Sequence, residues 1–214
     1  MINVVKKIIY IFVVLSPSLT LSAQKSAEEE LDGRLGHIRN FEAKFSQRTS
    51  DQHQRLISEG SGSFKYKKPD SVRWEIHTPI EQQIIINRGK IWVYDPDLEQ
   101  VFTDNYIAGI STSPLFTILG TEGKLSSAYS IHRSLDENNN STFKLTAKKP
   151  NEPIRDIEIS FMKETLTSLS IRTHDQDSEF FFSNQRVNSK MSNSNFLFKI
   201  PPNVDIIDRS ILSE

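Results

Sequence analysis

Two short clusters of ionisable residues have side chains that could bind a metal ion or act in acid–base catalysis. His174, Asp175 and Asp177 have side chains that can ligate a metal ion, and Asp95 and Asp97 could act as a paired general acid and base. Each cluster lies between two stretches of alternating apolar and polar residues, where a turn is expected to hold polar side chains. A proline between the two acids of the second cluster favours a tight turn. We therefore interpret both clusters as turns, and we expect no catalytic residue, no metal and no cofactor.

Other signatures of catalysis are missing from the sequence. It has no Gly-x-Ser-x-Gly nucleophile motif, no glycine-rich phosphate-binding loop and no histidine pair at i, i+4. It also has no cysteine, which excludes disulfides, thiolate chemistry and a lipid-modified N-terminal cysteine. An enzyme is therefore disfavoured, although an enzyme that holds a lipid or an envelope polymer in an apolar pocket stays open as an alternative.

Residues 60–101 form the best-defined part of the predicted fold. Aromatic and β-branched residues alternate there with charged ones, and turn residues at 68–70, 78–79, 87–89 and 95–97 divide the stretch into four or five strands. A period of two gives one face these apolar side chains: Phe64, Tyr66, Val72, Trp74 and Ile76. The opposite face carries Lys65, Lys67, Arg73, Glu75 and His77. The pattern predicts a sheet with one apolar and one wet face.

The rest of the chain predicts a mainly β protein with few helices. Ser26 and the acids after it favour a helix that contains Leu31, Leu35 and Ile38, and strand alternation begins near residue 40. Glycines at 60 and 62 are expected to permit a bulge or sharp curvature. Further strands are expected at 128–133, 142–147, 154–161, 166–172 and 179–182, then a polar loop at 184–195 and a last strand at 196–200.

Residues 113–119 predict a short apolar helix within this series of strands. Ser113 is a suitable N-cap, a proline follows at the first helical position, and Leu115, Ile118 and Leu119 share one face. Such a helix is either a core plug between strands or, if the glycines around it act as joints, a movable lid. The sequence leaves both interpretations open.

The first 23 residues are interpreted as a cleaved signal peptide. Lys6 and Lys7 precede an apolar run at 8–15 that is too short to span a bilayer, and small residues follow up to Ala23. Residues 24–214 are then expected to form a single domain. Their 24 basic and 27 acidic residues give a net charge of about −3, so we expect no nucleic acid as a partner.

Six motifs follow one another along the predicted mature chain. They are FEAKFSQ at 41–47, GSGSF at 60–64, a proline at 69 followed by VRW at 72–74, WVYDPDLEQV at 92–101, SPL at 113–115, and FLFKIPP with VDII at 196–207. In this order they resemble the outer-membrane lipoprotein carriers of the LolA family, over nearly all of the predicted mature chain. The resemblance implies an unclosed antiparallel β-barrel, or half-barrel, with a helical lid over an apolar cavity.

The resemblance also implies a soluble periplasmic chaperone and no enzyme. Such a carrier shields the acyl chains of lipoproteins between an inner-membrane ATP-driven release complex and an outer-membrane acceptor lipoprotein similar to LolB, and we expect it to be a monomer. The missing cysteine favours the carrier over that acceptor, which is itself lipidated. The main alternative is a periplasmic sensor of the same fold that binds a lipid or lipopeptide, because fold and cavity alone do not separate the two.

An acyl chain needs a continuous apolar concavity, because each CH₂ left in water costs about 0.8 kcal/mol. We expect the following residues to line it: Phe45, Phe64, Tyr66, Val72, Trp74, Ile85, Leu115, Ile118 and Leu119. An ordinary core role for the two tryptophans stays open.

Lys68 and Val72 depart from the pattern of the family. Members usually have arginine immediately before this proline, where the sequence has Lys68, and often a larger apolar residue at the position of Val72. The two-residue period places Lys68 on the side of Phe64 and Tyr66, where it is either a lysine that extends to water at the strand end or the latch that the resemblance implies. As a latch, it would hold the lid shut in the empty carrier through carbonyl oxygens at the C-terminal end of the lid helix.

Overall fold

A computed structural model describes residues 25–105, 118–119 and 125–210 of the chain. Within these ranges the helices are α1 (Ala27–His37), α3 (Leu125–Ala128) and the 3₁₀ turn η1 (Asn193–Phe196). The strands are β1 (Asn40–Asp51), β2 (Leu56–Lys67), β3 (Ser71–Thr78), β4 (Gln82–Asn87), β5 (Lys90–Asp95), β6 (Gln100–Asn105), β7 (Tyr129–Leu135), β8 (Ser141–Ala147), β9 (Ile154–Met162), β10 (Thr165–Thr173), β11 (Gln176–Val187) and β12 (Asp205–Asp208). The predicted signal peptide and Leu115 lie outside the described residues.

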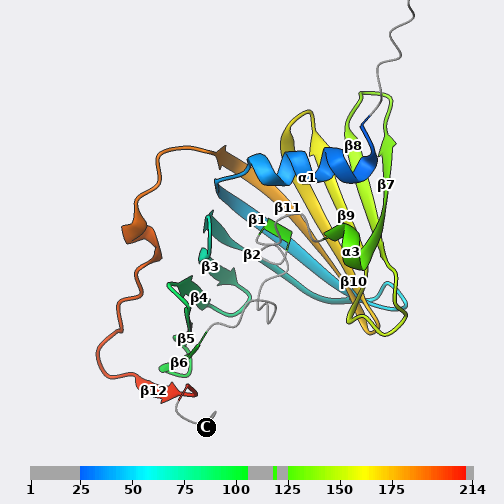
Figure 1. Cartoon of the computed structure of the whole chain (residues 1–214). Coiled ribbons are helices and arrows are strands. Elements are labelled where there is room, and N and C mark those ends of the chain that lie inside the picture. The colour runs from blue at the N-terminus through cyan, green and yellow to red at the C-terminus, as the bar shows by residue number, and fades with distance from the viewer. Residues whose placement is uncertain (1–24, 106–117, 120–124, 211–214) are drawn as a thin grey trace, which may run out of the picture.

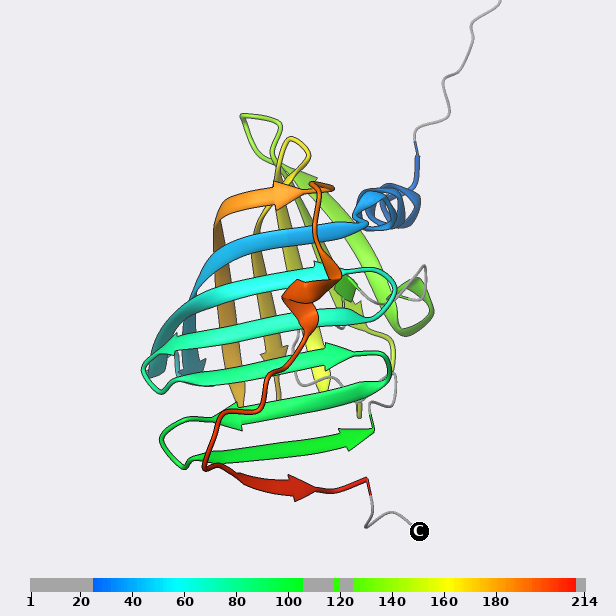
Figure 2. The same ribbon diagram turned by 90° about the vertical axis from the view of Figure 1, so that its left-hand side faces the viewer.

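The described strands form one 12-stranded sheet with the order β12-β6-β5-β4-β3-β2-β1-β11-β10-β9-β8-β7. Neighbours are antiparallel, except that β12 runs parallel to β6, which the sequence analysis did not predict. The sheet curls strongly, and α1 lies across its concave side (Figures 1 and 2). The two edge strands, β12 and β7, are not neighbours, so the sheet is unclosed. The predicted mainly β, unclosed and mostly antiparallel fold is confirmed.

Helix α1 begins at the N-cap residue that the sequence analysis identified, Ser26. The Ser26 hydroxyl accepts a hydrogen bond from the Glu29 main-chain N–H at 3.1 Å, and the Glu29 carboxylate accepts one from the Ser26 N–H at 3.2 Å. This reciprocal capping box satisfies donors that have no partner inside the helix. Leu31 and Leu35 are buried on one side of α1, which packs that side against the concave face of the sheet.

A glycine in β2 allows the sheet to bend over an aromatic side chain. The pairing of β2 with β3 shifts register between Ser61 and Gly62. A Cβ atom at Gly62 would lie 2.0 Å from the Glu75 carbonyl oxygen and 2.6 Å from Cζ of Phe45. Both approaches are far inside van der Waals contact, so any side chain at this position would push the strand and the ring apart. The predicted bulge or curvature at the glycines is confirmed.

The predicted strand at 196–200 is wrong. The main-chain carbonyls of Asn195 and Leu197 accept hydrogen bonds from the Arg73 guanidinium, at 2.6 and 3.0 Å, instead of pairing with a neighbouring strand. Phe198 stacks on Trp92, with ring centroids 6.3 Å apart. The apolar alternation of this segment arises because it crosses the outer face of the sheet (Figure 2).

Strand β11 is longer than predicted, so the polar segment after it begins later. The sequence predicts a strand at 179–182 and a loop from Asn184, whereas β11 runs Gln176–Val187. It pairs with β10 on one side and with β1 on the other. Residues 183–187 pair with β1 alone, and this pairing overrides the weak strand preference of the polar C-terminal end.

Candidate functional site

The predicted cavity residues of the first three strands gather on the concave face. The register pairs Phe64 with Trp74 and Tyr66 with Val72, and directly paired residues share a face. The Phe45 ring lies 4.7 Å from that of Trp74, centroid to centroid. Each of these five side chains is at most 4% exposed. The sequence period therefore assigned them to the correct face.

More phenylalanines extend this aromatic surface than the sequence analysis included. Phe180 of β11 lies 5.6 Å from Trp74, and Phe41 of β1 lies 5.8 Å from Phe182, measured between ring centroids. Phe41 could have been found, since it is four residues before Phe45 on the same strand. Phe180 and Phe182 lie in a run of three phenylalanines. In such a run the two-residue alternation does not show which side chains face the concave side.

Ile85 does not belong to the concave face, which corrects the prediction. It pairs with Arg73 on one side and Trp92 on the other, whereas Ile84 and Ile86 pair with Trp74 and Val72. Ile85 is fully buried, but outside the apolar cluster that contains Ile84 and Ile86. β4 is covered on both faces and has three consecutive isoleucines. The two-residue alternation therefore could not show which of them faces the concave side.

Two residues of the predicted helix at 113–119 can be placed. Ile118 and Leu119 are 1% and 2% exposed and belong to the same apolar cluster as the concave face. The Tyr66 hydroxyl donates a buried hydrogen bond to the Leu119 main-chain carbonyl at 3.0 Å. The wall formed by β2 is therefore joined to these residues by both apolar packing and a polar contact.

Lys68 connects the end of β2 to α1. Its ammonium donates to the Gly36 main-chain carbonyl, in the last turn of α1, at 3.3 Å. Its main-chain N–H donates to the Arg39 carbonyl at 2.8 Å. Gly36 belongs to α1, and most of the 113–119 segment, where the sequence analysis expected acceptors, lies outside the described residues. The C-terminal carbonyls of any helix carry partial negative charge and lack intrahelical donors, so α1 offers an equivalent acceptor.

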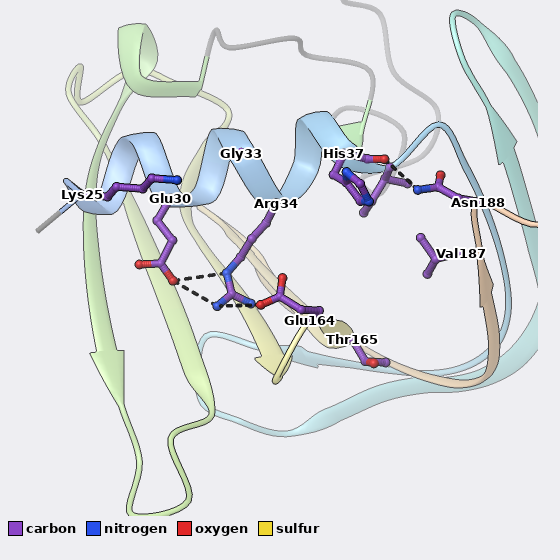
Figure 3. Close-up of a pocket in the computed structure, with 10 residues that line it drawn as sticks. Lys25, Glu30, Gly33, Arg34, His37, Glu164, Thr165, Val187 and Asn188 are labelled. Atoms are coloured by element: carbon purple, nitrogen blue, oxygen red, sulfur yellow. Dashed lines mark hydrogen bonds and ion pairs between the residues drawn. The ribbon is translucent and has the colours of Figure 1, made fainter.

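A hollow of about 800 Å³ lies beside α1, between that helix, the turn joining β9 to β10 and the end of β11. Figure 3 shows its charged side: Arg34 pairs with Glu30 at 3.0 Å and with Glu164 at 3.7 Å. The Asn188 amide donates to the His37 carbonyl at 2.9 Å. These walls suit polar groups better than an acyl chain. The sequence analysis missed the hollow because its residues come from three distant segments with no shared motif.

Asp97, His174 and Asp175 lie between strands, as interpreted from the sequence, whereas Asp95 is the last residue of β5 and Asp177 the second residue of β11. The Asp95 carboxylate accepts from the Leu98 main-chain N–H at 3.1 Å in the turn between β5 and β6. The Asp177 carboxylate accepts from Arg172 and from Gln54, both at 3.1 Å, at the turn between β10 and β11. These carboxylates therefore hold neighbouring chain segments together.

A charged network lies on the outer face, behind the apolar wall. Glu75 accepts hydrogen bonds from Arg73 and from the Ser63 hydroxyl, each at 2.8 Å. Burial opposes the ionisation of Glu75, but these hydrogen bonds outweigh it and hold the pKa of its carboxyl below the ordinary value. The charges of Glu75 and Arg73 are therefore paired on the outer face, where the segment between β11 and β12 covers it.

The fold and the apolar face together define a class of protein. Its members have an unclosed, mostly antiparallel sheet with a continuous, buried apolar surface on the concave side. Within the described ranges, no three His, Cys, Asp or Glu side chains are placed to hold a metal ion. None of the described helices is both long and apolar enough to cross a membrane.

Comparison with known proteins places the chain within this class. The model of a family described as outer membrane lipoprotein carrier protein LolA matches residues 36–199. The outer-membrane lipoprotein carrier protein of Hahella chejuensis is 28% identical over 190 residues, which cover 88% of this chain and 91% of that protein. That of Coxiella burnetii is 30% identical over 189 residues, which cover 87% and 89%. The chain belongs to the LolA family of outer-membrane lipoprotein carrier proteins, which are transport proteins and not enzymes.

A solved structure supports the fold independently of sequence similarity. The crystal structure of an uncharacterized conserved protein from Thermus thermophilus matches with a TM-score of 0.57 at 8% identity. The match covers 86% of this chain and 100% of that one. At this identity the likeness concerns the fold alone.

Proposed function

We propose that this chain is a periplasmic chaperone that shields the acyl chains of lipoproteins released from the inner membrane and delivers them to an outer-membrane acceptor. One observation carries the proposal beyond family membership. The concave face is a single apolar cluster that extends from the aromatic wall of β1–β4 to α1 and to Ile118 and Leu119. A surface of this kind is what an acyl chain needs in water.

The energetics fit a carrier that must both bind and release. A long acyl chain gains on the order of 10 kcal/mol when it leaves water. The concave face is covered by its own side chains and by α1, so a cargo chain must separate groups that already contact each other. The cost of this separation lowers the net affinity, which favours transfer to an acceptor.

The roles proposed for individual residues follow from their positions. Phe45, Phe64, Tyr66, Val72 and Trp74 form the wall that acyl chains contact, and Ile118 and Leu119 belong to the same apolar cluster. Ile84 and Ile86 take the place that the sequence analysis gave to Ile85. Lys68 is the proposed latch, and in the described residues its acceptor is the Gly36 carbonyl of α1.

The partners and the location belong to the same proposal. The chain would receive lipoproteins from an ATP-driven release complex of the inner membrane and hand them to an acceptor lipoprotein similar to LolB, acting as a monomer. The signal peptide would be cleaved after Ala23 or Ser22, which would leave one soluble carrier domain in the periplasm.

Depletion of the protein in its host tests this function. Fractionation of the envelope is expected to show outer-membrane lipoproteins retained at the inner membrane, and expression of the wild-type chain is expected to restore their distribution. Normal sorting of all lipoproteins after depletion would contradict the carrier and favour the sensor of the same fold.

A further inference from the structure

Tyr66 places a hydroxyl group within the apolar concave face. Its side chain is 1% exposed, and the hydroxyl donates to the Leu119 main-chain carbonyl at 3.0 Å. Tyr66 and Leu119 both belong to the apolar cluster of the concave face, together with Phe64 and Trp74. This hydrogen bond therefore lies among groups that are almost all apolar, where a polar contact is strong and its loss is costly.

An acyl chain cannot replace this hydrogen bond, because its methylene groups neither donate nor accept. If an acyl chain separates Tyr66 from Leu119, this hydrogen bond is broken while the hydroxyl stays in apolar surroundings. A phenylalanine at the same place would impose no such cost.

We propose that the Tyr66 hydroxyl sets the affinity of the carrier for acyl chains. The inference rests on the function proposed above and adds a residue that regulates binding at that site. The hydroxyl lowers the affinity for an acyl chain about tenfold, which corresponds to the loss of a single buried hydrogen bond, and thereby assists release. Tyr66 thus acts in the opposite sense to its neighbours Phe64 and Trp74, whose rings favour binding.

A purely structural role for the same hydrogen bond predicts a different result. In both cases Tyr66→Phe lowers the melting temperature of the empty protein, because the Leu119 carbonyl loses its donor. Only the proposed role predicts that the variant binds acyl chains more tightly.

The test is a titration of the purified protein with a dansyl-labelled peptide that carries an S-diacylglyceryl cysteine. Tyr66→Phe is expected to lower the Kd about tenfold and to slow transfer of the peptide to phosphatidylglycerol vesicles by a similar factor. Tyr129→Phe is the matched control, since the Tyr129 hydroxyl also donates to a main-chain carbonyl, but to that of Ile154, at 3.4 Å, and not to that of Leu119. Its Kd is expected to equal that of the wild type.

Equal or weaker binding by folded Tyr66→Phe would overturn the inference while leaving the carrier function intact. Tyr66→Met, which also lacks the hydroxyl, gives a second measurement and is expected to bind more tightly than the wild type as well. Failure of the wild type to bind the peptide at all would overturn the proposed function, and the inference with it.

Discussion

The contact between Lys68 and Gly36 joins a strand end to a helix end with one charged side chain. The ammonium donates to a carbonyl in the last turn of α1, where the helix dipole concentrates negative charge. Lysine provides donors around a single point charge, whereas arginine presents a planar fork that can bind two acceptors at once. The contact that Lys68 makes is therefore expected to be weaker than the contact that an arginine would make at the same position.

Replacement of Lys68 tests whether this contact is a latch. Lys68→Leu is expected to load lipoprotein but to release it more slowly, because the closed, empty state loses a stabilising contact. Lys68→Arg is expected to transfer at least as well as the wild type. The measurement is transfer from purified, loaded carrier to purified acceptor, with Lys44→Leu, a change at an exposed lysine of β1, as the control. Unchanged transfer by Lys68→Leu would show that Lys68 is an ordinary surface lysine.

At the scale of elements, the segment between β11 and β12 holds the outer face of the sheet. Lys67 donates to the Met191 carbonyl at 2.9 Å, and Arg73 donates to two carbonyls farther along the same segment. Alternate residues of β2 and β3 thus bind the segment outside, while Tyr66 and Trp74 face the apolar cluster inside. The two-residue period of a strand separates these two tasks.

Arg73→Met is expected to destabilise the fold by about 2 kcal/mol, because two carbonyls and the Glu75 carboxylate lose a charged donor. Urea unfolding measures this effect, and Arg48→Met, at an exposed arginine of β1, should lie within about 0.5 kcal/mol of the wild type. An equal effect of both changes would contradict the role of Arg73.

The same variant should change how stability depends on pH. Because the pKa of Glu75 is lowered on folding, its ionised form contributes stability that is present above the ordinary value of 4.5. This contribution is lost as the pH falls through the lowered pKa of the folded state. In Arg73→Met the lowering is smaller, so urea unfolding below pH 4.5 should show a weaker pH dependence than in the wild type.

The elements that could be predicted from the sequence are those with one buried and one exposed face. In β2 and β3, Tyr66 and Trp74 alternate with Lys67 and Arg73, so both the strands and their apolar face were correct. Prediction failed where a strand is covered on both faces, as at Ile85. It also failed where an extended segment packs without a pairing partner, as at 196–200. The β12 strand was missed because it pairs with β6, about a hundred residues earlier, through a contact that no local pattern contains.

At the scale of the whole molecule, the unclosed sheet makes two different surfaces from one set of strands. The two tryptophans of the chain mark them: Trp74 is 4% exposed within the concave cluster, and Trp92 stacks on Phe198 at the outer face. Both are on neighbouring parts of the same sheet, so a general loosening of the fold would affect both. A ligand in the concave face would affect Trp74 alone.

The central claim, that acyl chains bind against the concave face, is tested most directly by fluorescence quenching in two single-tryptophan variants. Trp92→Phe leaves Trp74 as the reporter, and Trp74→Phe leaves Trp92. A lipopeptide whose acyl chains carry bromine atoms, which quench only on close contact, is expected to quench Trp74 strongly and Trp92 little. Quenching of Trp92 alone, or equal quenching of both, would contradict binding at the concave face.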